Sequence, residues 1–373
     1  MVGPLFAKQR SGSEKAADFS LIIVPERRPG SLGLRGETMP SKDIVVIGAS
    51  AGGVEALQRL SASLPPDFPA AIFVAQHLSP NGRSLLPLLI GRVGPLPASS
   101  PEDGEEIVPG RIYVAAPDQH MLLRPGRVLM RRGPKENRTR PAVNALFRSA
   151  AAAYGGRVIG VVLTGLLDDG TEGLIAIKAA GGLSVIQDPA DAAWPSMPQN
   201  ALKRDHVDHR VALDGLGELL GRLVREPAGV SVPLPEEYII EDRMAAQDFA
   251  IMEPDFVTPG QPSHLSCPDC GGVLNQIEIE NELRFRCQVG HAFTPLGLAA
   301  AQNDELEHAL AVAARTHRDR MRLFEQMRDS AEARGLQHAE ARWNSASQEA
   351  SQMIEVLEQA IARLSAPLSD GEA

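Results

Sequence analysis

Short aliphatic runs alternate with helix-like segments through residues 43–224, and this alternation limits the possible folds more than any other feature. The aliphatic runs, which indicate strands, are residues 44–47, 71–75, 158–163 and 183–187. The segments with helical periodicity are residues 52–64, 85–90, 142–154, 171–180 and 215–224. Strands of a buried parallel sheet are apolar on both faces, and helices connect them. We therefore predict an α/β fold with a doubly wound, mostly parallel sheet.

Three shorter runs, at residues 111–115, 121–124 and 128–130, are separated by Gly and Pro turns. They predict a hairpin excursion from the sheet. Only 4% of the residues are aromatic, so the core must be built mainly from Val, Leu, Ile and Ala.

The rest of the chain divides by composition. Residues 1–41 are rich in Gly, Ser, Arg and Lys, which predicts a disordered tail before an α/β domain at 42–225. Residues 226–262 carry prolines and acidic residues with weak periodicity, which predicts a linker. The remaining predictions are a zinc-ribbon-like module at 263–294, a helical hairpin at 295–366 with Gly335 near its middle, and a disordered end at 367–373.

Charge and hydropathy exclude several classes of function. The formal net charge of −10 argues against a nucleic-acid partner, which usually needs a basic face. The sequence lacks an apolar run of about 18 residues, the length that spans a bilayer. Its first residues also lack the pattern of a secretory signal. We therefore expect a cytoplasmic protein that does not insert into membranes.

The first aliphatic strand runs directly into the sequence GASAGG at residues 48–53, and a helix follows. A strand that ends in G-x-S-x-G before a helix has the pattern of a nucleophile elbow, with Ser50 as the nucleophile. The backbone amides of Ala51, Gly52 and Gly53 lie at the helix start and are candidates to stabilise an oxyanion.

A Gly-rich turn after a first strand is more often a phosphate or dinucleotide cradle. That alternative requires an acidic residue at the end of the second strand. The second strand instead ends in Gln76 and His77, which disfavours a dinucleotide site.

His77 and the acidic pair Asp168 and Asp169 follow two further strands of the predicted sheet. Catalytic groups of open α/β sheets gather beyond the carboxyl ends of the strands, so we expect these side chains at the edge that carries Ser50. There a neutral imidazole can accept the serine proton while a carboxylate orients the ring. From the residues alone the alternative is equally open: the two acids can be a helix cap and a solvated charge.

At these residues the sequence resembles the catalytic domain of the chemotaxis-type protein-glutamate methylesterases, the CheB-type family. The matching blocks, within about residues 42–224, are IGASAGG at 47–53, QH at 76–77, PDQHM at 117–121, RTRP at 138–141, LTG at 163–165, DG at 169–170 and WPSMP at 194–198. The resemblance implies a serine hydrolase whose catalytic triad is Ser50, His77 and Asp169. It also implies demethylation of glutamate methyl esters on a chemoreceptor in bacterial signalling, and some members of the family also deamidate glutamine.

The sequence departs from the family at three points. Ala51 stands where the family often has Thr or Ser, and Leu166 stands where it usually has Met. Members usually carry an N-terminal phospho-receiver domain, and the residues before Lys42 are too few to form one. We therefore expect no phosphorelay control within this chain.

Arg138 and Arg140 lie in a basic loop before the helix expected at 142–154. We take them as candidate substrate-binding residues, because cations can guide an acidic substrate helix. Solvated surface charge is the alternative. His120, by contrast, we expect to be structural.

All three cysteines lie in the small C-terminal module, which favours metal binding over disulfides. Cys267 and Cys270 lie on a tight turn, a strand-like stretch follows, and Cys287 and His291 close the module. This spacing is typical of a zinc ribbon. Four protein ligands leave no open position, so we expect a structural zinc ion coupled to folding, and no cofactor for catalysis. The alternative is three buried thiols with an unrelated His.

Two classes of function remain open. The first is a hydrolase that acts on a methylated protein substrate. The second is a non-catalytic signalling scaffold, in which the zinc-ribbon-like module and the helices bind partners. The complete Ser/His/Asp set favours the hydrolase, and the C-terminal helices make self-association a further hypothesis.

Overall fold

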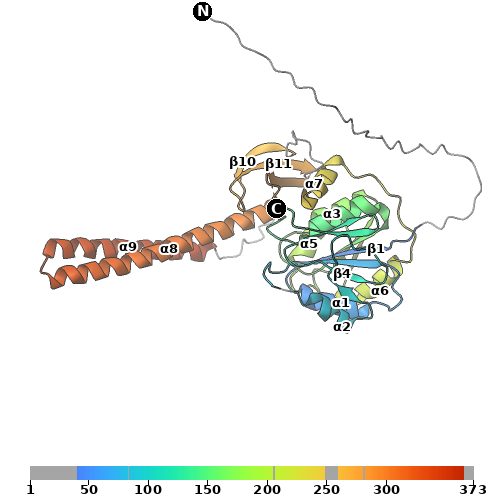
Figure 1. The fold of residues 1–373 in the computed structure, drawn as a ribbon, viewed down its shortest axis with the longest axis horizontal. Coiled ribbons are helices and arrows are strands. Elements are labelled where there is room, and N and C mark those ends of the chain that lie inside the picture. The colour runs from blue at the N-terminus through green and yellow to red at the C-terminus, as the bar shows by residue number, and fades with distance from the viewer. Residues whose placement is uncertain (1–39, 83, 205, 248–258, 280–281, 365–373) are drawn as a thin grey trace, which may run out of the picture. The chain divides into compact units, whose positions relative to one another are not determined.

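The structure is a computed structural model of the chain that describes residues 40–82, 84–204, 206–247, 259–279 and 282–364 (Figure 1). The predicted disordered segments at 1–41 and 367–373 lie outside these residues, apart from Pro40 and Ser41. Residues 248–258 of the predicted linker lie outside them as well.

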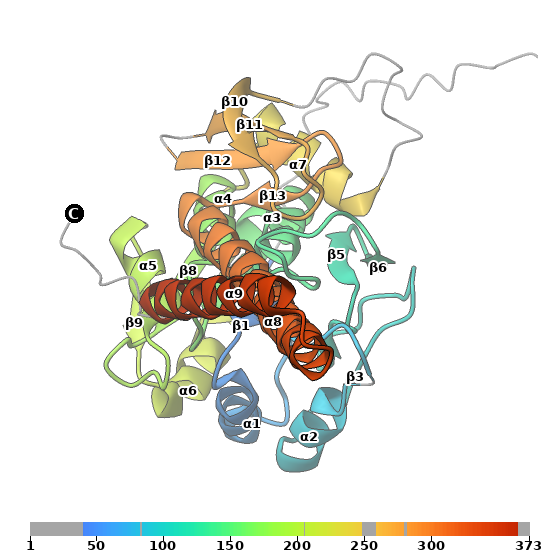
Figure 2. The same ribbon diagram turned by 90° about the vertical axis from the view of Figure 1, so that its left-hand side faces the viewer.

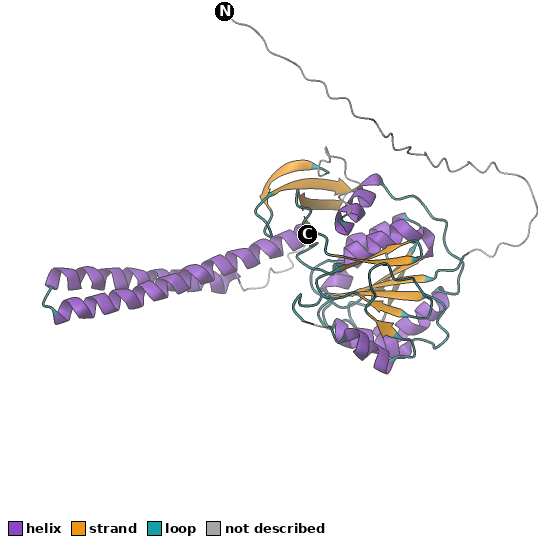
Figure 3. Ribbon diagram, viewed as in Figure 1, coloured by secondary structure: helices purple, strands orange, loops and turns teal. Residues whose placement is uncertain are grey.

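A seven-stranded parallel sheet forms the centre of the α/β part (Figure 3). Its order is β3-β4-β2-β1-β7-β8-β9, and every neighbouring pair runs parallel. The strands are β1 (Ile44–Ala49), β2 (Ala71–Gln76), β3 (Ala98–Ser99), β4 (Ile112–Val114), β7 (Val158–Val162), β8 (Leu183–Gln187) and β9 (His209–Val211). All six residues of β1, the middle strand, are buried. A sheet that is apolar on both sides must be covered on both sides.

Helices cover both faces of this sheet (Figures 1 and 2). One face packs against α1 (Gly53–Ser63), α2 (Leu86–Val93) and α6 (Leu213–Leu223). The other face packs against α3 (Val143–Tyr154), α4 (Thr171–Ala179) and α5 (Ser196–Arg204), and a short 3-10 turn, η1 (Gly155–Arg157), links α3 to β7. The prediction of a doubly wound, mostly parallel α/β sheet is therefore confirmed.

The predicted hairpin excursion is confirmed only for its second part. β5 (His120–Arg124) and β6 (Arg127–Arg131) form a two-stranded antiparallel hairpin. The run at 111–115 belongs to the main sheet instead, because β4 pairs in parallel with β2 and the ring of Tyr113 stacks on Phe73 at 5.1 Å. The short elements β3, β9 and α5 were not predicted.

The predicted linker contains a packed helix. α7 (Glu236–Ala246) buries Tyr238 and Met244, and it contacts α3 and the β5–β6 hairpin. The linker prediction was therefore wrong for these residues. The helix was not recognised in the sequence because its buried face carries carboxylates. Glu241 is buried against Arg148, and its Oε2 lies 3.3 Å from Arg148 Nη1. A buried acid that is paired in this way looks like a solvent-facing residue in the sequence.

A second sheet and two long helices form the C-terminal part. The four antiparallel strands are β10 (Gln261–Ser266), β11 (Val273–Ile279), β12 (Glu282–Cys287) and β13 (Ala292–Phe293). The helices α8 (Pro295–Ala333) and α9 (Gln337–Leu364) pack side by side, and the rings of Phe324 and Trp343 stack between them at 5.8 Å. The predicted helical hairpin is confirmed. Among the described residues, no helix combines the length and the apolar character that a membrane crossing needs.

Replacing Tyr238 tests whether α7 belongs to the folded core. Its side chain is 1% exposed. We predict that Tyr238→Ala lowers the free energy of unfolding by about 3 kcal/mol, the usual cost of removing a buried aromatic side chain. Urea denaturation followed by circular dichroism measures this change. Glu237→Gln, at an exposed position of the same helix, should change it by less than about 0.5 kcal/mol; equal effects of both variants would contradict the packing of α7.

Candidate functional site

Three predicted site residues follow strands that end at the same edge of the main sheet. Ser50 follows β1, His77 follows β2, and Asp169 lies in the loop between β7 and α4 (residues 163–170, the Asp169 loop). Because β1 pairs in parallel with both β2 and β7, the carboxyl ends of the three strands lie side by side. Catalytic and binding groups of open α/β sheets gather at this edge.

The side chains of these residues form one hydrogen-bonded row. Ser50 Oγ lies 3.1 Å from His77 Nδ1, and His77 Nε2 lies 2.7 Å from Asp169 Oδ2. The His77 side chain is 17% exposed and that of Asp169 only 2%, so the row runs from the surface into the interior. Such a row can take the proton from the hydroxyl and stabilise the imidazolium that results.

The beginning of α3 holds the Asp169 carboxylate. Its Oδ2 accepts a hydrogen bond from the backbone N of Val143 at 2.8 Å, and its Oδ1 accepts one from the backbone N of Asn144 at 3.1 Å. The first amides of a helix have no partner within the helix, and the helix dipole adds positive potential there. Gly48 allows this arrangement, because a Cβ at that position would lie 2.2 Å from Val143 Cγ1.

The Asn144 side chain ties the Asp169 loop to α3. Its Oδ1 accepts hydrogen bonds from the backbone N of Gly170 and of Gly173, both at 2.9 Å, and its Nδ2 donates to Glu172 Oε2 at 3.3 Å. Asn144 is 1% exposed. This residue was not predicted from the sequence, where an Asn at a helix start indicates only a cap.

Hydrogen bonds also fix the turn that carries Ser50. Its backbone N donates to the Thr164 carbonyl at 3.0 Å, and Gln76 Nε2 donates to the Ser50 carbonyl at 2.8 Å. Gly52 has a φ of +73°, a left-handed conformation that favours Gly. The supporting roles of Gln76 and Thr164 were not predicted, and their position at strand ends was the only signal for them.

The three amides predicted to stabilise an oxyanion are not equivalent. The backbone N of Gly53 donates to the Ser50 carbonyl at 2.9 Å, so the prediction was wrong for this amide, which is already used within the turn. The amides of Ala51 and Gly52 have no hydrogen-bond partner within the described part of the chain. These two stay candidate oxyanion donors.

Two exposed apolar residues, Leu166 and Trp194, belong to segments that lie close to the serine turn. Leu166 is 50% exposed and Trp194 is 47% exposed. The backbone N of Trp194 donates to Thr164 Oγ1 at 2.8 Å, and Thr164 Oγ1 donates to the Ala51 carbonyl at 3.0 Å. The Trp194 segment is therefore fastened to the serine turn, and neighbouring exposed apolar side chains of this size are candidates for contact with another macromolecule.

Arg138 and Arg140, predicted to bind substrate, both pair with carboxylates of the chain itself. Arg140 Nη2 lies 2.6 Å from Asp118 Oδ1, and Arg138 Nη1 lies 2.6 Å from Asp304 Oδ2 on α8. Substrate binding by these arginines stays a prediction. His120 is 0% exposed and its ring makes hydrogen bonds to the backbone, in keeping with the structural role expected of it.

Asp168, the neighbour of Asp169, has different partners. Its Oδ1 accepts a hydrogen bond from Thr294 Oγ1 at 2.9 Å, and its Oδ2 lies 3.7 Å from Arg204 Nη1. Burial raises the pKa of Asp168 to about 6, although Thr294 and Arg204 act in the opposite direction. The acid that contacts His77 is thus Asp169, and Asp168 contacts the start of α8.

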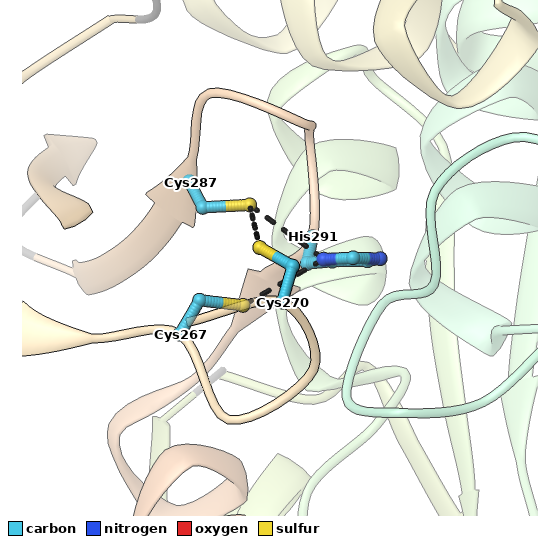
Figure 4. Close-up of side chains that lie close together, drawn as sticks. All are labelled: Cys267, Cys270, Cys287 and His291. Atoms are coloured by element: carbon cyan, nitrogen blue, oxygen red, sulfur yellow. Dashed lines mark hydrogen bonds between the residues drawn. The ribbon is translucent and has the colours of Figure 1, made fainter. Parts of the chain in front are cut away.

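The four predicted metal ligands converge in the small sheet (Figure 4). We call Cys267, Cys270, Cys287 and His291 the Cys/His cluster. Their ligand atoms all lie within 4.8 Å of one another. Three thiols and one imidazole at such separations can hold one metal ion.

The buried Asp168 makes stability depend on pH. The unfolded chain loses this proton near the ordinary pKa of 3.8, whereas the folded protein keeps it up to about pH 6. Raising the pH from about 4 to above 6 therefore destabilises the folded protein through this group, because burial disfavours the ionised form. We predict that Asp168→Asn is more stable than wild type by roughly 3 kcal/mol at about pH 7.5, with less than about 1 kcal/mol of this gain left at about pH 4. Urea denaturation at both pH values measures the difference.

Asp319→Asn is the matched control, because Asp319 is an exposed residue of α8. Its effect on the free energy of unfolding should be small and the same at both pH values. A gain for Asp168→Asn that is equal at the two pH values, or a loss at neutral pH, would contradict the prediction.

Comparison with known proteins identifies relatives of the α/β domain. Residues 45–220 match the profile of the CheB methylesterase family. The chain is 35% identical over 182 residues to a putative protein-glutamate methylesterase/protein-glutamine glutaminase of Leptospira interrogans, which covers 48% of this chain and 94% of that protein. It is 40% identical over 191 residues to protein-glutamate methylesterase/protein-glutamine glutaminase 4 of Anaeromyxobacter dehalogenans, which covers 50% of this chain and 53% of that protein.

A solved structure is also similar. The crystal structure of the Thermotoga maritima CheB methylesterase catalytic domain is 34% identical, with a TM-score of 0.47, and the match covers 49% of this chain and 98% of that one. The family profile falls on the domain that carries Ser50, His77 and Asp169, and it ends before α7, the small sheet and the helical hairpin. Since the Leptospira protein is matched over nearly its whole length, this chain belongs to the CheB methylesterase family.

Proposed function

We propose that this chain is a serine hydrolase that demethylates glutamate methyl esters on a protein substrate. The observation that carries the proposal is the hydrogen-bonded row, with 3.1 Å between Ser50 and His77 and 2.7 Å between His77 and Asp169. Family membership supports it, because relatives at 35% and 40% identity are named protein-glutamate methylesterase/protein-glutamine glutaminase.

In the first half of the proposed reaction, Ser50 Oγ attacks the ester carbonyl while His77 Nδ1 takes the hydroxyl proton. The new bond produces a tetrahedral oxyanion, which the amides of Ala51 and Gly52 stabilise. The intermediate then collapses, the bond between the carbonyl carbon and the methoxy oxygen breaks, and His77 passes its proton to the leaving group. Methanol departs and an acyl-enzyme remains.

In the second half, a water molecule attacks the acyl-enzyme while His77 takes one of its protons. The bond to Ser50 Oγ breaks, the serine regains its proton from His77, and a glutamate carboxylate is released. The same acyl-enzyme forms from a glutamine side chain if ammonia leaves in place of methanol. The double name of the relatives makes this deamidation a second reaction to test.

The role of Asp169 follows from its hydrogen bonds. Its Oδ2 accepts from His77 Nε2, so the neutral imidazole carries its proton there and presents the lone pair of Nδ1 to Ser50. Because backbone amides of Val143 and Asn144 also bind this carboxylate, it cannot turn away from the ring. Asp169 therefore orients His77 and stabilises the imidazolium.

The surroundings of Ser50 support a macromolecular substrate. Ser50 and His77 are both partly exposed, and the exposed apolar residues Leu166 and Trp194 belong to segments close to the serine turn. An ester carried on a protein surface can reach Ser50 while the substrate packs on these two side chains. We propose a methylated signalling protein such as a chemoreceptor as this substrate. The scaffold hypothesis has less support, since binding alone does not require a row of hydroxyl, imidazole and carboxylate.

Removing the nucleophile tests the reaction. We predict that Ser50→Ala lowers the rate of methanol release from a methylated receptor fragment by a factor on the order of 10⁴ or more, because no group remains to form the acyl-enzyme. Gas chromatography of released methanol measures the rate. Ser79→Ala, at an exposed position two residues after His77, should retain the wild-type rate. Equal rates for Ser50→Ala and wild type would rule out the hydrolase.

Replacing Asp169 and its neighbour Asp168 by Asn, one at a time, tests whether Asp169 orients His77. Asp169→Asn should lower kcat by a factor of roughly 10³ to 10⁴, since an amide cannot hold the imidazole in the required tautomer. Asp168→Asn should lower it by no more than a few-fold, because Asp168 does not orient His77 and the amide Oδ1 of Asn can still accept the hydrogen bond from Thr294. Steady-state kinetics with the same methylated fragment compare the variants. A larger loss from Asp168→Asn than from Asp169→Asn would refute the assignment of Asp169.

A further inference from the structure

The geometry of the Cys/His cluster matches a tetrahedral zinc site. The sulfur atoms of Cys270 and Cys287 are 3.7 Å apart, and Nδ1 of His291 lies 3.6 Å from the sulfur atoms of both Cys267 and Cys287. In a tetrahedron with zinc–sulfur bonds of about 2.3 Å, the ligand atoms stand about 3.8 Å apart. Figure 4 shows the four side chains pointing toward one another. Three of the six ligand separations match this value and all six are within 4.8 Å, so the four ligand atoms surround a space of about the size that one zinc ion needs.

We propose that the Cys/His cluster binds one structural zinc ion, and that the sheet folded by this ion holds the Asp169 loop in its active geometry. The second half of this inference rests on the proposed function, because it names how the same site is kept in order. The first half does not depend on the function.

Two tight turns present the ligands. In the first, the backbone N of Gly271 donates to the Cys267 carbonyl at 2.8 Å, and Gly271 has a φ of +72°. In the second, the backbone N of Gly290 donates to the Cys287 carbonyl at 2.9 Å, and Gly290 has a φ of +102°. Glycine makes both turns possible, since other residues adopt these conformations only with strain. Such paired turns are the usual carriers of a four-ligand structural zinc.

The small sheet has only a small apolar core of its own around the ligands. Its core cluster contains seven buried residues, and two of these are the ligands Cys267 and Cys287. Domains of about 40 residues or fewer generally need a metal, disulfides or a partner for stability. The chain's three cysteines all belong to the cluster, and none forms a disulfide. Zinc binding should therefore add to the folding free energy of this sheet, which also packs Ile277 and Ile279 into the core of the α/β part.

Thr294 is the first contact between this sheet and the Asp169 loop. It follows β13 directly and caps α8, accepting a hydrogen bond from the backbone N of Gly297 at 2.9 Å. The same hydroxyl donates to Asp168 Oδ1 at 2.9 Å. Thr294 is 1% exposed, so water cannot replace it without a rearrangement. This bond fixes the residue next to Asp169.

Arg284 on β12 makes the second contact, with Glu172 at the start of α4, directly after the Asp169 loop. Its Nη2 lies 2.9 Å from Glu172 Oε2, and both side chains are 6% exposed. Glu172 in turn accepts a hydrogen bond from Asn144, the residue that clamps Gly170 at the end of the Asp169 loop. Burial raises the pKa of Glu172 to about 8, so this carboxyl group holds its proton at neutral pH. Removing Arg284 would leave a buried polar group without this partner, which is destabilising. Loss of the folded sheet would thus release the Asp169 loop at two points.

Within the described residues, neither Thr294 nor Arg284 forms a hydrogen bond or ion pair with Ser50 or His77, so both are positioning residues. Their effect on the reaction passes through the orientation of Asp169. A displacement of about 1 Å in a catalytic group can cost a factor of about 100 in rate. The zinc ion would then control the rate without any part in the chemistry.

The zinc content of the purified protein tests the first half of the inference, that the Cys/His cluster binds zinc. The full-length chain, expressed with zinc and purified without chelator, should contain about one zinc ion per chain by inductively coupled plasma mass spectrometry. Cys270→Ser should contain at least about tenfold less, because a thiolate ligand is lost. His264→Ala, an exposed histidine of β10 outside the cluster, should keep the wild-type content. Wild-type protein without stoichiometric zinc, or equal content in Cys270→Ser, would overturn the metal site.

Hydrogen–deuterium exchange and steady-state kinetics together test the second half of the inference. Thr294→Val removes the donor to Asp168 and leaves all four ligands in place. We expect unchanged zinc, at least about fivefold faster exchange in the Asp169 loop, and a kcat lower by roughly 10- to 100-fold at nearly constant KM. Thr294→Ser keeps the hydroxyl and should restore both exchange and kcat. Thr316→Val is the matched control on α8, where the Thr316 hydroxyl donates to Val312 O.

The outcomes separate this inference from the proposed function. Unchanged exchange of the Asp169 loop in both Thr294→Val and Cys270→Ser would overturn the coupling. If the wild-type chain released no methanol while the exchange responded as expected, the proposed function would fail and the coupling would stand. If methanol release were normal in wild type and in Thr294→Val, the coupling would be wrong and the hydrolase would stand.

Discussion

The hydrogen bonds that surround the Asp169 carboxylate determine the geometry of the whole site. This buried group accepts from His77 Nε2 and from the first two amides of α3, at distances between 2.7 and 3.1 Å. The amides need an acceptor because they begin a helix, and the carboxylate needs donors because it is buried. Each satisfies the other. Gly48 lets α3 approach β1 closely enough for this to happen at the same sheet edge that carries Ser50.

Residues of the C-terminal part, which follows the family domain, contact the region around Asp169 at this edge of the sheet. Residues 45–220 match the CheB methylesterase profile, whereas Thr294 and Arg284 belong to the segment after it. Thr294 binds the neighbour of Asp169, and Arg284 binds Glu172, which Asn144 connects to the same loop. The proposed hydrolase site and the proposed metal module would thus share one set of buried contacts. Such contacts offer a route by which the state of the small sheet could set the rate at Ser50.

The sequence predicted those features that local pattern determines. The parallel sheet follows from continuous aliphatic runs, and the positions of Ser50, His77 and the pair Asp168 and Asp169 follow from strand ends that must share an edge. The choice of Asp169 over Asp168 came from the family resemblance. Features set by long-range pairing were missed. The helix α7 was not predicted because Glu241 is buried against arginines from distant segments. The role of Asn144 was not predicted because its hydrogen-bond partners lie about 26 to 29 residues away in the sequence. The Gly53 amide was wrongly offered as an oxyanion donor because the turn's own hydrogen bond was invisible in the sequence.

The most direct test of the account asks whether Ser50 is an activated nucleophile. The full-length chain would be treated with a fluorophosphonate, and the modified peptide identified by mass spectrometry. The account predicts a single adduct on Ser50 that disappears in His77→Ala, because only a serine paired with the imidazole reacts readily. An unmodified Ser50, or equal modification in wild type and His77→Ala, would contradict it.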